Sequence, residues 1–415
     1  MRGVNGPAPL GAAARPAPAR HAPHGTTPDG TPTPPRPADA TPSALARRVR
    51  WTGCALAAVA TVGVLTGCST QNSGDKTPAA APASAAVSPP TTVTPAGTVT
   101  PAAPIAALLA VPGAGRLAEL DTDGSTVHLL DLAPPTGTPG NPAPGAPAGS
   151  APAAAASGAA NPAAPGTAGT RTVTLPARTA GLTPGGPGEI LAAAGTQILH
   201  IDTATGTVRA TPVGAAARAV ARRPDGTLAV ALTDHRVLIV ADDGRILHTV
   251  TGLTGADSVA AAGDTVAVLD LAQTSLTELD LGHGKPRLAL RAGTGATGLI
   301  ADHYQRLLVT DTAGGTLLVY TPDPLVLRQR FPVGSSPYAL AYDQRSETVW
   351  VTLTGSNEVA GFDLSTGIPE EVGRFATVRQ PDSVTIDDRT GDMFVGSATG
   401  DGLQRIGADD RKRGQ

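Results

Sequence analysis

A unit of about 40 residues recurs seven times in this 415-residue chain, and the repeat limits the fold more than any other feature. The clearest copy contains Ser336-Pro-Tyr-Ala-Leu-Ala-Tyr-Asp, Glu347-Thr-Val-Trp-Val-Thr-Leu-Thr and Gly355-Ser-Asn-Glu-Val-Ala-Gly-Phe-Asp. Each piece alternates or is rich in β-branched residues, and Gly, Pro, Asn or Asp bounds it. The pattern predicts three short strands joined by tight turns, with a fourth strand near Arg374–Val378.

The second strand of each unit can be followed along the whole repeat region. It occurs at Leu117, Ile190, Leu228, Val266, Leu307, Val349 and Met393. From Ile190 onward the spacings are 38, 38, 41, 42 and 44 residues, and the first spacing of 73 becomes 35 without the 38-residue tract 133–170. Seven such units predict an all-β, seven-bladed β-propeller, in which four-stranded blades surround a channel. A helical solenoid is the alternative, but no 3.6-residue periodicity is sustained.

Two stretches lack the large apolar side chains that a core requires. The chain before about residue 100 and the tract 133–170 consist mostly of Ala, Pro, Gly, Thr and Ser. Such composition does not offset the entropy of ordering a backbone. We therefore expect a disordered N-terminal region, and a disordered insertion between the third and fourth strands of the first blade. The propeller is expected over 97–132 and 171–408, with Gly97-Thr-Val-Thr100 supplying the strand that the last unit lacks.

Residues 47–67 form a secretory signal, with basic Arg47-Arg48-Val49-Arg50 before the uncharged run Cys54–Leu65. A transmembrane anchor is the alternative, but the run is shorter than the roughly 20 residues that a bilayer requires. The signal ends in Leu65-Thr-Gly-Cys68, which resembles the lipobox of bacterial lipoproteins. That resemblance implies lipid attachment at Cys68, with acyl chains such as palmitate, and a protein held at the outer face of the cytoplasmic membrane.

The segments on either side of the signal have separate expected roles. Residues 68–96 are Pro/Ala-rich, and we expect them to form a semi-extended tether. Residues 1–46 are either a disordered extension or the result of a misassigned start codon, for which Val49 is a candidate. Export through the twin-arginine route at Arg47-Arg48 remains an alternative to the general secretory route.

The repeat units carry a more specific pattern in two copies. Pro332-Val-Gly-Ser-Ser-Pro-Tyr-Ala-Leu-Ala, Val349-Trp-Val and Asn357-Glu-Val-Ala-Gly-Phe-Asp363 resemble the YVTN-type propeller repeats of bacterial surface and periplasmic proteins. The segment Ala193–Val208 is a second good copy. The resemblance covers most of Ile105–Gly407 and implies the fold, whereas a fold alone does not specify a function.

Charge limits the partners that we expect. Without the first 67 residues the chain holds 24 basic and 32 acidic residues, a net charge of −8. An acidic domain without a basic stripe argues against nucleic acid as a partner. We expect a monomer that contacts the membrane through its lipid and binds an envelope protein, a peptide or a small polar ligand. The Arg, Ala, Gly and Pro excess suggests a GC-rich, actinobacterial genome.

The sequence offers no catalytic motif. It has no Gly-x-Ser-x-Gly elbow, phosphate loop or dinucleotide fingerprint, and its His residues lack metal-ligand spacing. Cys54 leaves with the signal, so the mature chain has no thiol pair for a disulfide or a cysteine metal site. We predict no cofactor and no metal, and a bound redox group is not favoured.

The candidate ligand site lies where each innermost strand begins, because these positions meet at one mouth of the channel. Aligning the units gives Ile105, Arg178, Arg218, Asp257, Thr297, Tyr338 and Asp382. Two Arg, two Asp and a Tyr around one opening suit a small polar ligand or a peptide end, because guanidinium groups bind carboxylates as planar forks. Alternatively, the Arg and Asp side chains neutralise each other there.

These features predict a non-enzymatic binding or scaffold lipoprotein. The alternative is a metal-dependent hydrolase similar to propeller lactonases, which hold a divalent cation with Glu, Asn and Asp side chains in the channel. The aligned mouth positions include Asp257 and Asp382 but no Glu or Asn, which favours the binding module.

Overall fold

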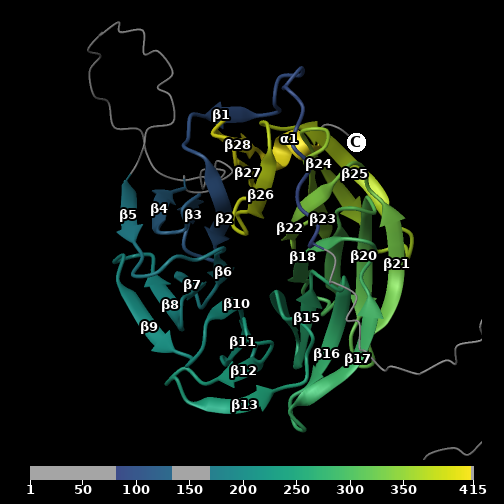
Figure 1. Cartoon of the computed structure of the whole chain (residues 1–415). Coiled ribbons are helices and arrows are strands. Elements are labelled where there is room, and N and C mark those ends of the chain that lie inside the picture. Colours follow the sequence, from purple (N-terminus) through teal and green to yellow (C-terminus); the bar gives the residue numbers. More distant parts are fainter. Residues whose placement is uncertain (1–80, 133–168, 413–415) are drawn as a thin grey trace, which may run out of the picture. The chain divides into compact units, whose positions relative to one another are not determined.

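The computed structural model describes residues 81–132 and 169–412, and these form seven four-stranded antiparallel sheets around a central channel (Figure 1). The predicted seven-bladed β-propeller is therefore confirmed. The extension 1–46, the signal 47–67 with Cys68, and all but the last two residues of the tract 133–170 lie outside the described residues. No helix within 81–132 and 169–412 is long and apolar enough to cross a membrane.

The strands of each blade follow one another from the channel outward. The innermost strands are β2 (Ile105–Val111), β6 (Thr183–Pro184), β10 (Ala217–Arg222), β14 (Ser258–Ala262), β18 (Ala296–Ala301), β22 (Pro337–Asp343) and β26 (Pro381–Ile386). The second strands are β3 (Arg116–Asp121), β7 (Glu189–Ala194), β11 (Leu228–Leu232), β15 (Thr265–Asp270), β19 (Leu307–Asp311), β23 (Thr348–Leu353) and β27 (Met393–Ser397). The third strands are β4 (Thr126–Asp131), β8 (Gln197–Asp202), β12 (Val237–Val240), β16 (Ser275–Asp280), β20 (Thr316–Thr321), β24 (Glu358–Asp363) and β28 (Leu403–Ile406). The outermost strands are β5 (Thr170–Thr174), β9 (Val208–Pro212), β13 (Ile246–Val250), β17 (Lys285–Arg291), β21 (Val326–Pro332), β25 (Glu370–Ala376) and β1 (Thr98–Thr100).

The last blade is closed by the N-terminal strand. Its order is β1-β28-β27-β26, with Thr98 opposite Arg405 and Thr100 opposite Leu403. The predicted closing strand is therefore confirmed. It joins the two ends of the propeller, so that no blade presents an unpaired third strand as an edge.

Burial follows the position of each strand in its blade. All four residues of β12 are buried, whereas four of the five residues of the neighbouring outer strand β13 are exposed. The buried side chains form seven apolar clusters, and each cluster lies between two adjacent blades. The middle strands pack on both faces because a blade meets a neighbour on either side, which explains their near-continuous apolar sequences.

The fourth strand of blade six lies a few residues earlier than predicted. It is β25 (Glu370–Ala376) rather than Arg374–Val378. Glu370 and Glu371 are exposed, so the solvent-facing outer position accepts charges that the sequence pattern treated as the end of a strand. The tract 133–170 falls between the third and fourth strands of blade one, since β4 ends at Asp131 and β5 begins at Thr170, the last residue of the tract.

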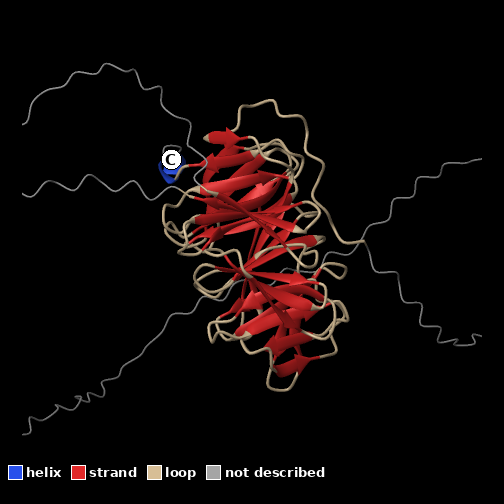
Figure 2. Ribbon diagram, turned by 90° about the vertical axis from the view of Figure 1, so that its left-hand side faces the viewer, coloured by secondary structure: helices blue, strands red, loops and turns tan. Residues whose placement is uncertain are grey.

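The two flat faces of the propeller carry different connections. One face holds the loops that lead into the innermost strands and those that join second to third strands; backbone bonds such as Thr354 N–H to Ser336 O link the two sets. The other face holds the remaining loops and the short helix α1 (Ala408–Lys412). The long N-terminal segment lies on the face opposite α1 (Figure 2). We call the face that carries the N-terminal segment the strap face, and the face that carries α1 the open face.

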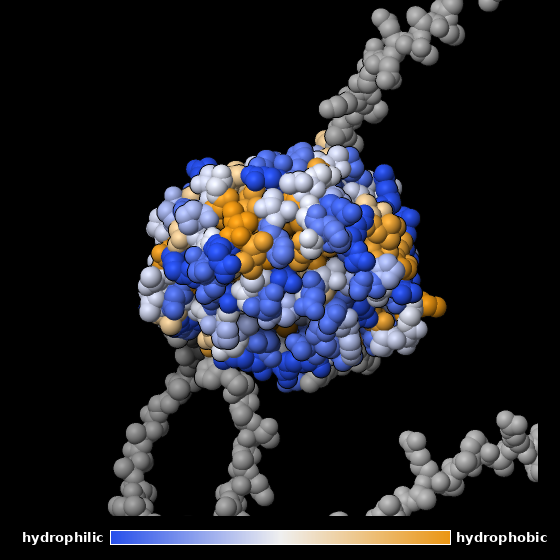
Figure 3. Space-filling view, turned by 90° about the horizontal axis from the view of Figure 1, so that it is seen from below, coloured by the Kyte–Doolittle hydropathy of each residue, from blue (hydrophilic) through white to orange (hydrophobic). Residues whose placement is uncertain are grey.

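The perimeter mixes apolar and polar side chains. Ile246 and Leu247 on β13, Leu288 on β17 and Leu327 on β21 are exposed. The apolar surface seen from this side is divided by polar residues (Figure 3). It therefore resembles the ordinary surface of a monomeric protein more than a single large docking patch.

Candidate functional site

The predicted mouth positions all lie at the strap face, where the innermost strands begin. Ile105 begins β2 and is buried, Arg178 lies in the exposed loop before β6, and Asp257 directly precedes β14. Four of the strands contain the other positions, which are Arg218 in β10, Thr297 in β18, Tyr338 in β22 and Asp382 in β26.

One pair of neighbours in this set forms an ion pair. Arg218 Nη1 lies 2.6 Å from Asp257 Oδ1, and the other carboxylate oxygen of Asp257 accepts a bond from the Leu271 amide. Thr297 exchanges hydroxyl contacts with Thr310 and Thr312 of its own blade. The pairing of Arg218 with Asp257 is the mutual neutralisation that the sequence left open as the alternative.

Tyr338 and Asp382 form a second local group. Burial raises the pKa of both side chains, and the charge of Asp382 adds to the effect on Tyr338. Gln380 Nε2 donates to Asp382 Oδ1 at 2.8 Å and also to the carbonyl of Ala86. Asp382 is thus engaged by the protein itself, whereas Thr377 Oγ1 and Ser383 Oγ at this end of blades six and seven are buried without partners among the described residues.

Residues 81–96, which we call the strap, lie against this face next to blades five, six and seven. Ala83 contacts Gly295, and the Ala86 amide donates to Ser336 Oγ. Further along, Asn357 Nδ2 donates to the carbonyl of Pro89. We expected residues 68–96 to be a flexible tether. The structure corrects this for 81–96, because the loops of three blades satisfy its backbone groups.

Ser88 is the most tightly held residue of the strap, at 2 % exposed. Its amide donates to Gln380 Oε1, and its hydroxyl donates to the Thr354 carbonyl and accepts from the Gln380 amide. A segment of Ala, Pro, Ser and Val has no apolar periodicity, so its composition contains no sign that it docks through hydrogen bonds.

The open face carries the large cavity of the molecule. It occupies about 1060 Å³ of the channel and is lined by the innermost strands of all seven blades. Its wall is mainly Leu, Val, Ile and Ala. Its rim is polar, and the rim residues are Arg222, Asp302, His303, Tyr342, Arg345 and Asp388. A cavity with an apolar body and a few polar groups at its mouth has the character of a small-molecule site.

An aromatic group stands at the rim between blades five and six. The ring of His303 lies 5.5 Å from that of Tyr342 and 3.9 Å from that of Tyr304. The Tyr342 hydroxyl is buried and has no hydrogen-bond partner in the part of the chain that the structure describes, and burial is the main cause that raises its pKa to about 12. It is therefore a neutral donor in the cavity wall, which a ligand acceptor would reach only by a small movement of that wall.

Most charges of the rim are already paired. Asp302 binds Arg306 at 2.5 Å, and Arg222 reaches Glu189 at 3.1 Å. Asp388 accepts from the Gly113 amide at 3.2 Å. Arg345 differs, because no carboxylate of the described ranges forms an ion pair with its guanidinium.

A buried hydrogen-bonded chain connects this rim to blade two. Glu189 Oε1 lies 2.8 Å from His200 Nδ1, and His200 Nε2 lies 3.1 Å from Thr211 Oγ1. Burial would raise the pKa of Glu189, but the Gly186 amide, His200 and Arg222 together lower it. His200 lies in β8 and is 3 % exposed, so it is a packed side chain of an apolar strand.

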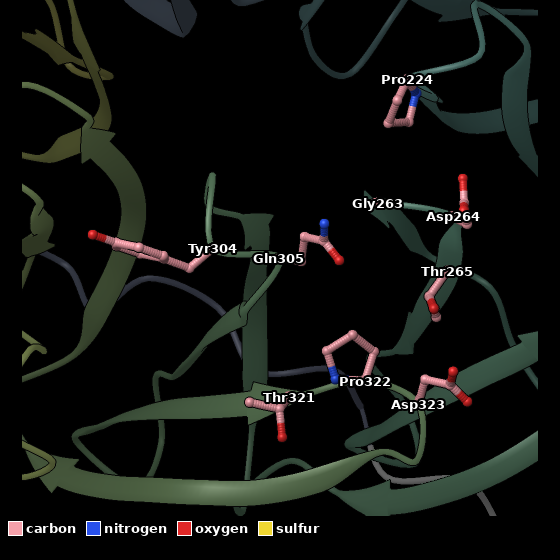
Figure 4. A pocket seen from close by; sticks show the side chains of 9 residues that line it. All are labelled: Pro224, Gly263, Asp264, Thr265, Tyr304, Gln305, Thr321, Pro322 and Asp323. Atoms are coloured by element: carbon pink, nitrogen blue, oxygen red, sulfur yellow. The ribbon is translucent and has the colours of Figure 1, made fainter. Parts of the chain in front are cut away.

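A second depression of about 500 Å³ lies on the open face at blades three to five. Its wall consists of turn residues, among them Pro224, Gly263 and Pro322, and the Tyr304 ring points away from Gln305 (Figure 4). Tyr304 instead donates to Glu347 at 2.6 Å and lies under Arg306. The depression also carries the polar side chains of Asp264, Thr265, Gln305, Thr321 and Asp323.

Across residues 81–132 and 169–412, no group of three His, Cys, Asp or Glu side chains is placed to hold a metal ion. The open-face rim was missed by the sequence reasoning, which aligned the beginnings of the innermost strands. Aligning their ends would have brought out Asp302, Asp343 and Asp387, which follow one another at spacings of 41 and 44 residues.

Solved structures share the fold at low sequence identity. A streptogramin B lyase matches with a TM-score of 0.55 and 11% identity, over 75% of this chain and 96% of that one. Hydrazine synthase of Kuenenia stuttgartiensis matches with a TM-score of 0.56 and 11% identity, over 77% and 99% of the two chains. A catalytically inactive virginiamycin B lyase from Staphylococcus aureus, solved with quinupristin, matches with a TM-score of 0.53 and 14% identity, over 75% and 97%.

These similarities establish a seven-bladed β-propeller and nothing finer, since fold does not determine function. No protein-family profile matches the chain, and no curated protein sequence matches it.

Proposed function

We propose that this protein is a lipid-anchored binding module of the cell envelope, which takes a small polar ligand or a peptide end into the open-face cavity. The observation that carries the proposal is the cavity itself, about 1060 Å³ lined by all seven blades. Its volume is that of a drug-sized ligand site, and its apolar wall would bury the body of such a ligand. The Tyr342 hydroxyl and the Arg345 guanidinium would orient the polar end.

The contrast with the strap face supports this choice of site. There, Arg218 is paired with Asp257, and Gln380 binds both Asp382 and the strap. Groups that already have partners gain little from a ligand, whereas unpartnered buried donors gain a full hydrogen bond. The ligand site predicted from the sequence is thereby moved from one end of the channel to the other.

The anchor part of the proposal rests on the lipobox-like Leu65-Thr-Gly-Cys68 and is tested separately. A Cys68→Ser variant should lose radiolabelled palmitate and leave the membrane fraction, because one or two acyl chains supply the attachment. Continued membrane fractionation of the variant would contradict the anchor without affecting the ligand site.

The binding part is tested by thermal unfolding of the Cys68→Ser protein with short peptide probes, such as N-acetyl-Ala-Leu and Ala-Leu. A probe that binds only the folded state stabilises it by mass action and so raises the thermal midpoint. At a probe concentration of ten times Kd, the free energy of unfolding rises by about 1.4 kcal/mol. The combined variant His303→Ala, Tyr342→Phe should remove that shift, and Arg178→Ala, Arg218→Ala at the strap face should keep it. Loss of the shift in the strap-face variant alone would return the site to the other mouth.

The metal-dependent hydrolase alternative has no observation in its favour within the described ranges, where no metal-holding cluster occurs. It would be revived by a rise in the thermal midpoint when Ca²⁺, Mn²⁺ or Zn²⁺ is added after EDTA treatment.

A further inference from the structure

A smaller pocket of about 190 Å³, distinct from the depression at blades three to five, lies beside the channel on the open face. Blade six supplies Arg345, Thr348 and Trp350, blade seven supplies Gly391, and helix α1 closes the pocket with Arg411. Two side chains of this wall are deeply buried, because Trp350 is 3 % exposed and Arg411 is 7 % exposed.

Both of these side chains carry a buried N–H donor without an acceptor. Within residues 81–132 and 169–412, Trp350 Nε1 and Arg411 Nε have no hydrogen-bond partner. A buried donor that forms no hydrogen bond costs about 1–3 kcal/mol, and two such donors beside one pocket double that cost. Such pairs are rare in folded proteins, where the large majority of buried polar atoms are satisfied.

The surrounding structure holds the indole in its place. The six-membered ring of Trp350 lies over Gly361 and Gly373, and a Cβ at Gly361 would come within 2.7 Å of it. Phe375 packs beside the ring at 5.9 Å. Because the glycines admit the ring so closely, the indole cannot rotate its N–H toward another partner without displacing blade six.

The guanidinium of Arg411 is fixed on its other side. Its Nη2 donates to the Gly391 carbonyl and to Asp343 Oδ2, and its centre lies 5.0 Å above the Trp350 ring. These contacts use the far end of the fork, and the buried Nε has no partner among the described residues.

The charge of the lining favours an anion. Asp343 compensates one of the two guanidinium groups, which leaves one positive charge in excess among the lining side chains. Arg345 is exposed and has no ion-pair partner among the described residues, and it lines both this pocket and the channel. Burial of Arg411, which disfavours its charged form, makes a negative partner still more valuable.

We propose that this pocket binds a small oxyanion, a carboxylate or phosphate group, through Arg345, Arg411 Nε and Trp350 Nε1. The volume admits a single such group with a few waters and excludes a large organic ligand. The bound group would tie α1 to blades six and seven. This site is separate from the proposed channel ligand, although Arg345 borders both.

Trp350 is an intrinsic fluorescent probe in the wall of this pocket. The chain has two Trp residues, Trp51 and Trp350, so a Trp51→Phe background leaves Trp350 as the only indole. Inorganic phosphate and sodium acetate would each be titrated into the full chain against sodium chloride at equal ionic strength. We expect a saturable change in Trp350 fluorescence with at least one of the two anions, and a matching rise in the thermal midpoint.

Variants assign the signal to the pocket. Arg345→Ala, at an exposed residue that the fold does not need, should weaken binding by tenfold or more. Trp350→Phe keeps an aromatic ring and removes the donor, and it should reduce the anion-dependent rise in the midpoint. The matched control is Arg236→Ala, a partly exposed Arg paired with Asp234 on the strap face, which should leave the affinity unchanged.

The outcomes separate the two ligand chemistries and the two proposed sites. Saturation by phosphate alone assigns a phosphate group, and saturation by acetate alone assigns a carboxylate. The channel variant Tyr342→Phe should bind the anion as the parent protein does, so failure of the channel proposal would leave this one standing. No saturable change with either anion, or equal affinity in Arg345→Ala, would overturn the pocket.

Discussion

The two faces of the propeller are built from the same repeat, yet one carries a docked segment and the other carries the cavities. On the strap face the loops bind each other and residues 81–96, through contacts such as Ser88 with Gln380 and Arg218 with Asp257. On the open face Tyr342, Trp350 and Arg411 keep buried donors without partners beside two cavities. The strap face also keeps Thr377 Oγ1 and Ser383 Oγ buried without partners among the described residues, so the contrast between the faces lies in the docked strap and in the cavities.

The largest effect should come from breaking the strap face at Ser88. A Ser88→Leu change removes the hydroxyl that bonds Thr354 and Gln380, and it adds volume at a buried site. Unsatisfied groups and overpacking together should lower the free energy of unfolding by about 4 kcal/mol. Urea unfolding of the Cys68→Ser protein measures this, with the exposed Ser365→Leu as control. A loss equal to that of the control would mean that the strap contributes nothing.

Glu119 tests whether every unpartnered buried group belongs to a ligand site. It lies on β3 between Leu108 and His128, in the seam between blades one and seven, and burial raises its pKa from the ordinary 4.5 to about 7. The folded state therefore favours the protonated acid, so stability is full below about pH 4.5 and declines as the pH rises toward 7. Above that the loss should reach about 3 kcal/mol.

A Glu119→Gln variant should consequently be more stable than the parent at pH 8 and similar to it at pH 4. Urea midpoints across this pH range measure the difference. A parent protein whose stability does not fall between pH 4.5 and 7 would show that the carboxyl finds a partner. Glu119 would then join the satisfied groups of the molecule.

Tyr342→Phe should have a smaller effect, and in the opposite direction from the Ser88 change. Its hydroxyl is buried without a partner, so its removal should stabilise the unliganded protein by about 1 kcal/mol. The same variant should bind the channel probes more weakly. Destabilisation by this change would indicate that the hydroxyl already has a structural role on the open face.

Arg218→Ala should have the smallest effect of the series. The Arg218 side chain is half exposed, so its ion pair with Asp257 is worth less than about 1 kcal/mol. We expect a small shift of the thermal midpoint that disappears in high salt, with no change in probe binding. A change in probe binding would contradict the assignment of the ligand site to the open face.

The repeat made the fold predictable. Spacings near 40 residues and alternating strands such as β23 determine the blade pattern, and the missing strand of the last unit indicated that β1 closes the ring. The strap could not be foreseen, because Ser88 docks through backbone and hydroxyl bonds that leave no periodic signature. The helix α1 was missed for a related reason, since Arg411 sits in a short charged segment that is typical of an exposed terminus.

The site was only partly predictable. The aligned positions do lie where the innermost strands begin, at one mouth of the channel. Aligning the repeats shows which residues occupy equivalent places in the blades, but not which of them already have hydrogen-bond or ion-pair partners. Arg218 and Asp257 pair, whereas the donors of Trp350 and Arg411 do not. Satisfaction of polar groups depends on three-dimensional contacts between blades, and no spacing along the chain records it.

Because the strap is docked on the propeller, only a short segment of chain separates the propeller from Cys68. If that cysteine carries the lipid as proposed, only residues 69–80 separate the anchor from Ala81, a chain of at most about 47 Å when fully extended. The propeller would then stay within that distance of its anchor, and any partner that it binds would have to come equally near to the membrane.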